Sequence, residues 1–478
     1  MIDRAAGLVS PMTLLWAGAL LASLTTSAPA AERRPNFVII YADDLGYGDL
    51  GCFGHPTIRT PNLDRMASEG LRFTQFYSAA PVCTPSRAAL MTGRLPIRNG
   101  MCSDKRRVLF PDSGGGIPET EITLAEALKS QGYATGCFGK WHLGHLPQFL
   151  PTNNGFDTYY GIPYSNDMDR LNDVAPPGRE AFWNPKIEYW NVPLLRGTEV
   201  IERPTDQTTI TRRYTEEAIS FIRAHQEEPF LVYLPHSMVH IPLFRSDEFV
   251  GKSARGLYVD CLEEVDWSVG QVLQALRDLN LDEQTLVFFS SDNGPWLTFN
   301  EHGGSAGLLK DGKGTTYEGG MREPTIAWWP SRVPSGRVTQ ELGSTMDIFT
   351  TCVTLAGADL PSDRIMDGVD LSSVLFDEGP SKRKAVLYYR GTTLMAARLG
   401  PWKAHYFTQT SYRKDSQTRV THDPPLLYHL GHDPGEQYNI NEAHPEIIAR
   451  IDALVAEHRQ HLDPPPSQLE IPLAVTNE

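Results

Sequence analysis

The chain has 478 residues, of which 41% are hydrophobic and 21% charged, which is typical of a folded globular protein and excludes a disordered or fibrous one. Its formal net charge of -15 argues against a general nucleic-acid or anionic-membrane binder, because such partners attract spread positive charge. An anionic ligand would therefore need a local basic pocket. The length fits one large α/β domain together with a smaller second domain.

The N-terminal residues 1–30 form a separate segment with the layout of a secretory signal. Arg4 precedes an apolar run at 12–24, and the small residues that follow make cleavage after Ala30 plausible. The run is short for a membrane-spanning helix, and a retained anchor is the alternative. Because no later stretch reaches about 18 uninterrupted apolar residues, we expect an exported protein, periplasmic or extracellular, without stable membrane insertion.

Cysteine and asparagine usage bear on the compartment. Export permits disulfides, but the sequence alone does not select a pairing among six cysteines. The chain contains no Asn-x-Ser/Thr site for N-glycosylation, which favours a bacterial exported protein over a glycosylated eukaryotic one.

The first predicted strand is Phe37–Tyr41, an apolar run without alternation, which indicates burial on both faces. Helices are expected at 60–70 and 85–93, and the stretch 123–144 predicts a helix, a glycine stop, a strand and a loop. If that loop is extended, Lys140 and His142 point to the same side.

Two further helices, at 211–226 and 258–280, precede apolar strands at 229–242 and 285–294. Helices that alternate with strands predict a large mixed, mainly parallel sheet sandwiched by helices. In such sheets, sites lie beyond the carboxyl ends of the strands. The polar residues at those ends are Asp43, Asp44, Lys140, His142, His240, Asp292 and Asn293.

The pattern changes near residue 383 to short strand-like runs that end in a helix at 444–461, which predicts a smaller antiparallel sheet packed against one helix. We therefore divide the chain into a signal peptide at 1–30, a catalytic domain at 35–380 and a small C-terminal α+β domain at 381–478.

Carboxylate and amide oxygens at two strand ends favour calcium or magnesium over zinc. An Asp-Asp pair alone more often forms a turn or a helix cap, so the metal interpretation depends on both groups together. Likewise, the Lys140 and His142 pair alone would be a surface patch, and His240 alone a structural histidine. The glycine-rich stretch 308–324 presents Lys313 but lacks the spacing of a phosphate-binding P-loop.

Cys83 opens the run "CTPSR", and by itself a structural cysteine is the simplest interpretation. Only three residues separate it from Arg87, too few for the loop of thiol phosphatases. However, "CTPSRAALMTGRLP" and "GYATGCFGKWHLG" occur together with "GFDTYYGIPYSND", "SSDNGP" and "GKGTTYEGGMREP". With these motifs, residues 35–470 resemble the formylglycine sulfatases of the alkaline phosphatase superfamily, in the arylsulfatase A and N-acetylgalactosamine-6-sulfatase branch.

The resemblance implies an alkaline-phosphatase-like fold and hydrolysis of aryl or carbohydrate sulfate monoesters. It further implies that a formylglycine-generating enzyme oxidises Cys83 to an aldehyde, whose hydrate is the nucleophile. Carried over by position, Asp43, Asp44, Asp292 and Asn293 hold Ca2+ together with the modified Cys83. Arg87 would stabilise the hydrate, Lys140, His142, Ser165, His240 and Lys313 would surround the sulfate, and His405 would lie near the pocket mouth.

In the implied mechanism, the hydrate attacks sulfur and the alcohol leaves with a proton from Lys313 or His240. His142 then removes a proton from the second hydroxyl, the aldehyde reforms and sulfate departs. Asp311 departs from the family pattern, since relatives carry a cysteine there that forms a disulfide. Two alternatives remain, namely a phosphonate or phosphodiester hydrolase of the same superfamily, and a noncatalytic sulfated-glycan binding protein in which Cys83 stays a thiol.

Overall fold

The structure is a computed structural model that describes Gly7 and residues 34–412 and 418–474. The predicted signal peptide at 1–30 thus lies outside the described residues, apart from Gly7. In the described part of the chain, no helix is both long and apolar enough to cross a membrane. From residue 34 onward the chain forms one compact unit, and the domain division near residue 380 stays a prediction.

In the described residues, the large sheet has 11 strands in the order β10-β2-β9-β8-β1-β7-β3-β4-β5-β6, with β11 beside β2. The central strands β8, β1, β7, β3 and β4 are parallel, whereas β9, β5 and β6 join their neighbours antiparallel. The strands are β1 (Asn36–Ala42), β2 (Leu71–Tyr77), β3 (Ala134–Phe138), β4 (Thr158–Gly161), β5 (Leu194–Arg196), β6 (Glu199–Glu202), β7 (Phe230–Pro235), β8 (Thr285–Ser291), β9 (Arg322–Trp328), β10 (Arg337–Thr339) and β11 (Gly343–Ser344).

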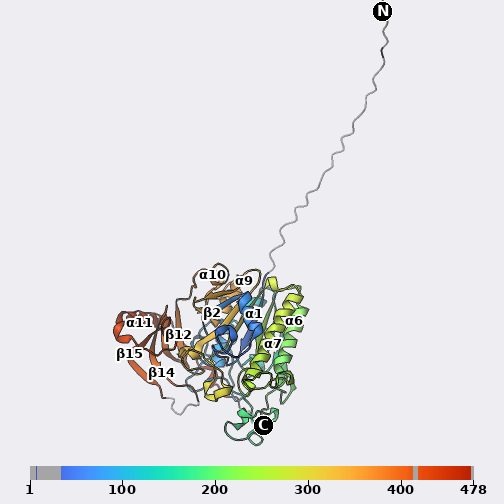
Figure 1. The fold of residues 1–478 in the computed structure, drawn as a ribbon, viewed down its shortest axis with the longest axis horizontal. Coiled ribbons are helices and arrows are strands. Elements are labelled where there is room, and N and C mark those ends of the chain that lie inside the picture. The colour runs from blue at the N-terminus through green and yellow to red at the C-terminus, as the bar shows by residue number, and fades with distance from the viewer. Residues whose placement is uncertain (1–6, 8–33, 413–417, 475–478) are drawn as a thin grey trace, which may run out of the picture. The chain divides into compact units, whose positions relative to one another are not determined.

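Helices cover both faces of this sheet, as the burial of β1 shows. Val38 and Ile40 belong to a core shared with α1, α6 and α7, whereas Phe37 and Ile39 belong to a second core shared with α2, α4 and α9. Helices α6 and α7 lie side by side in Figure 1. The helices are α1 (Pro61–Glu69), α2 (Cys83–Thr92), α3 (Pro96–Asn99), α4 (Leu124–Lys129), α5 (Glu180–Trp183), α6 (Ile210–Ala224), α7 (Leu257–Asp278), α8 (Glu318–Met321), α9 (Thr345–Leu355) and α10 (Ser372–Phe376).

The C-terminal part is a four-stranded antiparallel sheet in the order β12-β13-β14-β15, with α11 packed on it, coloured orange to red in Figure 1. Its elements are β12 (Ala385–Arg390), β13 (Thr393–Leu399), β14 (Trp402–Thr408), β15 (Val420–His429) and α11 (Pro445–Gln460). Both predicted layers, the helix-covered mixed sheet and the small antiparallel sheet, are confirmed.

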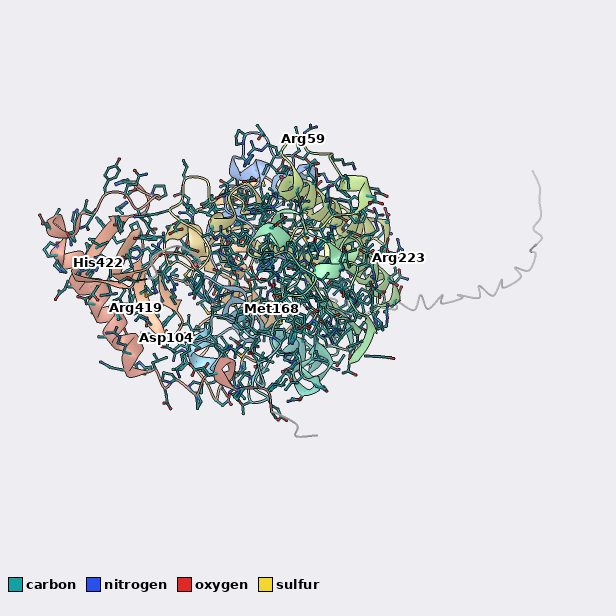
Figure 2. All side chains as sticks on the ribbon, turned by 90° about the horizontal axis from the view of Figure 1, so that it is seen from below. Arg59, Asp104, Met168, Arg223, Arg419 and His422 are labelled. Atoms are coloured by element: carbon teal, nitrogen blue, oxygen red, sulfur yellow. The ribbon has the colours of Figure 1, made fainter. Side chains whose placement is uncertain are left out.

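Polar contacts, some buried and some exposed, join the C-terminal sheet to the rest of the chain. Lys403 on β14 pairs with Glu318 on α8 and with Glu436, at 3.0 Å in each case, and all three side chains are fully buried. At the turn between β12 and β13, Thr392 donates its backbone N–H to the carboxylate of Asp104 at 3.0 Å. Asp104 is labelled beside this sheet in Figure 2. The junction therefore depends on matched charges.

We predict that Lys403→Met destabilises the protein by about 3–5 kcal/mol, because it removes the buried ammonium that Glu318 and Glu436 share. Lys382→Met is the matched control, since Lys382 is exposed and its pair with Asp370 at 3.3 Å should contribute less than about 1 kcal/mol. Urea unfolding of both variants measures the difference. Equal losses in the two variants would contradict the prediction.

Candidate active site

Three carboxylates meet where β1 and β8 end side by side. Asp43 and Asp44 follow β1, and Asp292 follows β8 and donates its N–H to the Ala42 carbonyl at 3.1 Å. The Asp44 N–H in turn donates to the Asp292 carboxylate at 3.2 Å. Asp44 has a left-handed φ of 59°, which turns the chain away from the strand direction. The parallel pairing of β1 with β8 thus brings residues almost 250 positions apart into contact.

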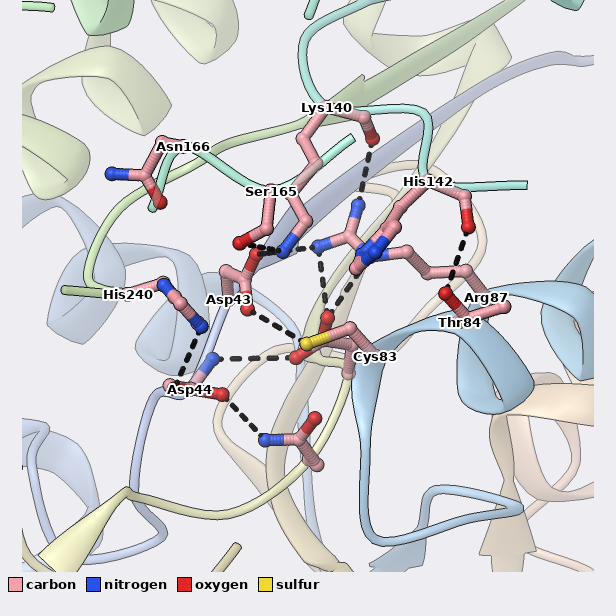
Figure 3. A network of polar contacts seen from close by, with 12 residues as sticks. Asp43, Asp44, Cys83, Thr84, Arg87, Lys140, His142, Ser165, Asn166 and His240 are labelled. Carbon is pink, nitrogen blue, oxygen red and sulfur yellow. Dashed lines mark hydrogen bonds and ion pairs between the residues drawn. The ribbon is translucent and has the colours of Figure 1, made fainter. Parts of the chain in front are cut away.

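Helix α2 begins at Cys83, two residues earlier than predicted from the sequence, so Cys83 and Arg87 lie one turn apart on the same face. The Cys83 thiol lies 3.4 Å from the Asp43 carboxylate. Arg87 donates to Asp292 at 2.9 Å, to Asp43 at 3.2 Å and to the Lys140 carbonyl at 2.8 Å (Figure 3). All six cysteines lie in the described residues, and none forms a disulfide.

The loop after β3 supplies Lys140 and His142. The Lys140 ammonium contacts Asp43 and donates to the Ser165 hydroxyl at 3.1 Å. The premise of an extended loop was wrong at His142, whose φ of 61° turns the backbone. The Thr84 hydroxyl fixes this turn by donating to the His142 carbonyl at 3.0 Å. His142 therefore reaches the site by a backbone turn, which alternation along a strand does not predict.

Backbone carbonyls determine which ring nitrogen carries the proton in His142 and in His240. Nε2 of His142 lies 3.0 Å from the Leu109 carbonyl and must donate to it, while Nδ1 is buried and finds no hydrogen-bond partner within residues 34–412 and 418–474. In His240, Nδ1 donates to the Ile241 carbonyl, and Nε2 lies 3.7 Å from Asp44. Burial lowers the pKa of both rings well below the ordinary value, so both are neutral.

Lys313 closes the cluster from the glycine-rich loop before α8. Its ammonium lies 2.7 Å from Asp44 and 3.4 Å from the Cys83 sulfur, and it sits 4.4 Å from the centroid of the Trp296 ring. Burial alone would lower the pKa of Lys313, but the carboxylate of Asp44 raises it above its ordinary value. Lys313 is therefore charged.

A small cavity opens on this cluster. Cys83, His142, Ser165, His240 and Lys313 line it, while Arg87 and Lys140 are fully buried and do not. His405 is fully buried, with its Nε2 2.6 Å from Glu436, and it does not line this cavity. Sequence reasoning missed six lining residues, Val82, Arg107, Val108, Asp167, Met168 and Trp296. Only Asp167 lies within a quoted motif, at the end of "GFDTYYGIPYSND".

The cluster can hold a metal ion. Potential ligand atoms of Asp43, Asp44, Cys83 and His240 all lie within 4.8 Å of one another. The amide of Asn293 donates to Asp44 at 2.7 Å, and its Oδ1 is buried without a partner among the described residues. An unpaired buried amide oxygen beside carboxylates suits a hard cation. Burial and the neighbouring carboxylate of Asp43 raise the pKa of both Asp44 and Asp292. A bound cation would stabilise the ionised form of both carboxylates.

A helix-covered sheet with buried carboxylates and cationic groups at its strand ends defines a hydrolase of anionic esters. The Sulfatase family model matches residues 35–358, and the model for the C-terminal region of aryl-sulfatase matches residues 381–476. The chain belongs to the sulfatase family, and it is a sulfuric ester hydrolase.

Individual relatives agree with this assignment. N-acetylgalactosamine-6-sulfatase of Canis lupus familiaris is 41% identical over 95% of this chain and 91% of its own. Human arylsulfatase A is 44% identical over 89% of this chain and 88% of its own. The crystal structure of PsFucS1 sulfatase from Pseudoalteromonas sp. superposes with a TM-score of 0.80 at 29% identity, covering 92% of each chain. The predicted family and branch are therefore confirmed.

His236, which follows β7 beside this site, should make stability depend on pH. Burial lowers its pKa to about 3, and Ser268 lies 3.1 Å from its Nε2. The unfolded chain, with a histidine pKa near 6.5, binds the proton first, so stability is present above about pH 6.5 and falls as the pH drops. We predict that His236→Gln flattens this fall between about pH 6.5 and 4. Urea unfolding at several pH values tests it, and identical slopes in both proteins would contradict it.

Proposed function

We propose that this sulfatase hydrolyses carbohydrate or aryl sulfate monoesters with Cys83 as the precursor of its nucleophile and Ca2+ as its metal. The observation that carries the proposal is the position of Cys83, which lines the cavity at the start of α2 within 3.4 Å of both Asp43 and Lys313. No other cysteine lines that cavity among the described residues.

Cys83 is a poor nucleophile as a thiol. Burial and the carboxylates of Asp292 and Asp43 raise the pKa of the thiol well above its ordinary value. A catalytic cysteine needs the opposite shift, because the thiolate is the reactive form. This supports conversion of Cys83 to formylglycine by a formylglycine-generating enzyme. The hydrated aldehyde would supply one hydroxyl for attack on sulfur and a second through which the sulfate can be released.

Asp43, Asp44, Asp292 and Asn293 would hold Ca2+ together with the modified Cys83. Oxygen donors and the unpaired Asn293 Oδ1 fit a hard cation, which would polarise sulfate oxygens when bound. Without a metal ion, the negative charges of the three carboxylates are balanced by three cationic side chains, Arg87, Lys140 and Lys313. A divalent cation added to this balance gives the site a net positive charge, which suits an anionic ester.

The cationic side chains have separate roles. Arg87 is held by Asp43, Asp292 and a backbone carbonyl, so its guanidinium is fixed beside Cys83 before substrate binds. Lys140 and Ser165 lie together and would bind sulfate oxygens. Donors that are held in place before the reaction stabilise the developing charge without reorganising.

The proton for the departing alcohol would come from Lys313. Lys313 is charged and lines the cavity, whereas neutral His240 already commits its only N–H to the Ile241 carbonyl. Of the two donors that the resemblance implies, the hydrogen bonds therefore favour Lys313. His142 has the complementary arrangement, since its free Nδ1 can accept a proton during release of sulfate.

An anionic substrate from outside the cell fits the exported location, periplasmic or extracellular, that we propose from the N-terminal sequence. The relatives named above act on sulfated compounds by name, and a complex with k-i-k-neocarrahexaose is known for Ps i-CgsB, which has a TM-score of 0.77 and is 28% identical. These names support a sulfated glycan as the substrate. The phosphonate monoester hydrolase of Agrobacterium radiobacter shares the fold at 19% identity.

We predict that the purified enzyme releases nitrophenol from 4-nitrophenyl sulfate with a kcat/KM at least about a hundredfold above that for 4-nitrophenyl phosphate and phosphonate esters, a difference of about 2.8 kcal/mol in transition-state binding. Parallel assays with the three esters measure this ratio. A preference for the phosphorus esters would overturn the proposal in favour of the rival hydrolase.

We predict that Cys83→Ser retains the fold and accumulates one covalently bound sulfate per chain, because a serine ester has no second hydroxyl for release. Intact-mass measurement after incubation with substrate detects the adduct, and thermal unfolding checks the fold. Rapid multiple turnover by this variant would contradict the role of the hydrate.

We predict that Lys313→Ala lowers kcat for a sugar sulfate by about 10²–10⁴, the usual contribution of a general acid. Its effect on 4-nitrophenyl sulfate should be smaller, because nitrophenolate leaves without a proton. His240→Asn is the control, and its losses should not depend on the leaving group. The reverse pattern would assign the proton to His240.

A further inference from the structure

Beside the catalytic cavity lies a second recess, and Arg107 belongs to the lining of both. The recess is also lined by Arg390 at the end of β12 and by Tyr412, so the C-terminal sheet forms one of its walls. Val82, which precedes Cys83, likewise faces both spaces. The recess therefore begins where the catalytic cavity ends.

Neither arginine of this recess has a carboxylate partner among the residues that the structure describes. Arg390 is only 6% exposed, yet to those residues its guanidinium makes a single hydrogen bond, from Nη1 to the Thr410 carbonyl at 2.7 Å. Within residues 34–412 and 418–474, neither Arg390 nor Arg107 forms an ion pair. By contrast, Arg106 pairs with Asp112. Guanidinium N–H groups that have no protein partner can donate to an anionic ligand in the recess.

The Tyr412 ring lies close to both guanidinium groups. The carbon Cζ of Arg390 lies 4.4 Å from the centroid of the tyrosine ring, and that of Arg107 lies 5.5 Å from it. The ring face compensates part of their charge but supplies no hydrogen-bond acceptor for the guanidinium N–H groups. These donors are therefore arranged around one aromatic surface.

The recess is fixed to the catalytic loop. The Ser411 hydroxyl donates to the Lys313 carbonyl, and the Tyr412 ring covers Gly314, where an added Cβ would lie 2.5 Å from the ring. Gly314 also has a φ of 83° and donates its N–H to the Pro81 carbonyl at 2.8 Å. Asp104 holds the loop that precedes Arg107 against the β12–β13 turn. A group bound in the recess would thus lie at a set position relative to Lys313.

We propose that Arg107 and Arg390 form a second anion subsite, which binds a carboxylate or a further sulfate of the same molecule whose sulfate ester reaches Cys83. Planar guanidinium forks bind such oxyanions with paired hydrogen bonds, and the Tyr412 ring offers an apolar surface to a sugar ring. This inference rests on the proposed function and extends it. The preferred substrate is then a polyanionic sulfated saccharide, bound by a local basic site on a chain with a net charge of -15.

The test compares Arg107→Gln with Arg106→Gln, a matched control on the neighbouring arginine, which lines neither cavity. Three substrates are used: 4-nitrophenyl sulfate, a disaccharide whose sulfated sugar adjoins a uronate, and a disulfated monosaccharide. We expect Arg107→Gln to lower kcat/KM for at least one doubly charged substrate about tenfold more than for 4-nitrophenyl sulfate, mainly through KM. The substrate that is affected identifies the anion as carboxylate or sulfate. Equal losses on all three substrates, or equal behaviour of the two variants, would overturn the subsite.

Arg390 provides a second test that allows for misfolding. Arg390→Lys keeps the charge and Arg390→Gln removes it, and thermal unfolding measures the stability of each. We expect the selectivity for the doubly charged substrate to fall further in Arg390→Gln than in Arg390→Lys at similar stability. The same selectivity in both would count against the subsite.

The two proposals fail in different ways. If the wild-type enzyme released no sulfate from any substrate, the proposed function would be overturned. The subsite would then be judged by calorimetric binding of the desulfated uronate disaccharide and of the disulfated sugar. Weaker binding of either compound to Arg107→Gln than to Arg106→Gln supports it, and equal binding of both rejects it.

Discussion

Three carboxylates and three cationic side chains are buried together at the ends of β1 and β8, and the site depends on how their charges balance. Asp43 contacts both Arg87 and Lys140, and Asp44 pairs with Lys313 at 2.7 Å. Burying any of these charges without a partner would cost several kcal/mol. The pairing therefore holds each side chain in one position before substrate binds. The same pairing places the cationic groups where a sulfate ester would carry its negative charge.

The sheet makes this cluster possible because its central strands are parallel and end at one edge. β1 lies between β7 and β8, so the residues that follow all three strands share one space. Loops with left-handed residues, such as Asp44 and His142, then bring side chains inward that the strand direction alone would not. The C-terminal sheet completes the arrangement, because Ser411 fixes the carbonyl of the loop that carries Lys313.

Much of this could be predicted from the sequence where local pattern and chemistry agree. The continuous apolar run of β1 predicts a strand that is buried on both faces. The acidic residues after it, together with those after β8, predict a site that can bind a metal cation. The antiparallel strands β2 and β9 were not predicted, because their burial comes from tertiary pairing with each other. The turn at His142 was missed since a positive φ leaves no pattern in a single sequence.

Residues whose neighbours in space are distant in the sequence were the hardest to predict. The family resemblance places His405 near the pocket mouth, yet its Nε2 contacts Glu436, some 30 positions away, with which it is buried. Arg107 and Arg390 belong to no motif. They line the same recess only because the C-terminal sheet packs beside α2. A resemblance to a family transfers the residues that match its motifs, whereas the lining of the second recess follows from how the C-terminal sheet of this chain packs.

The central claim is that Cys83 is a precursor and not itself the nucleophile. The most direct measurement is the mass of the tryptic peptide Phe73–Arg87 from enzyme purified from its native host. The account predicts an aldehyde in place of the thiol at Cys83. An unmodified thiol in active enzyme, from a host that makes the modifying enzyme, would contradict it.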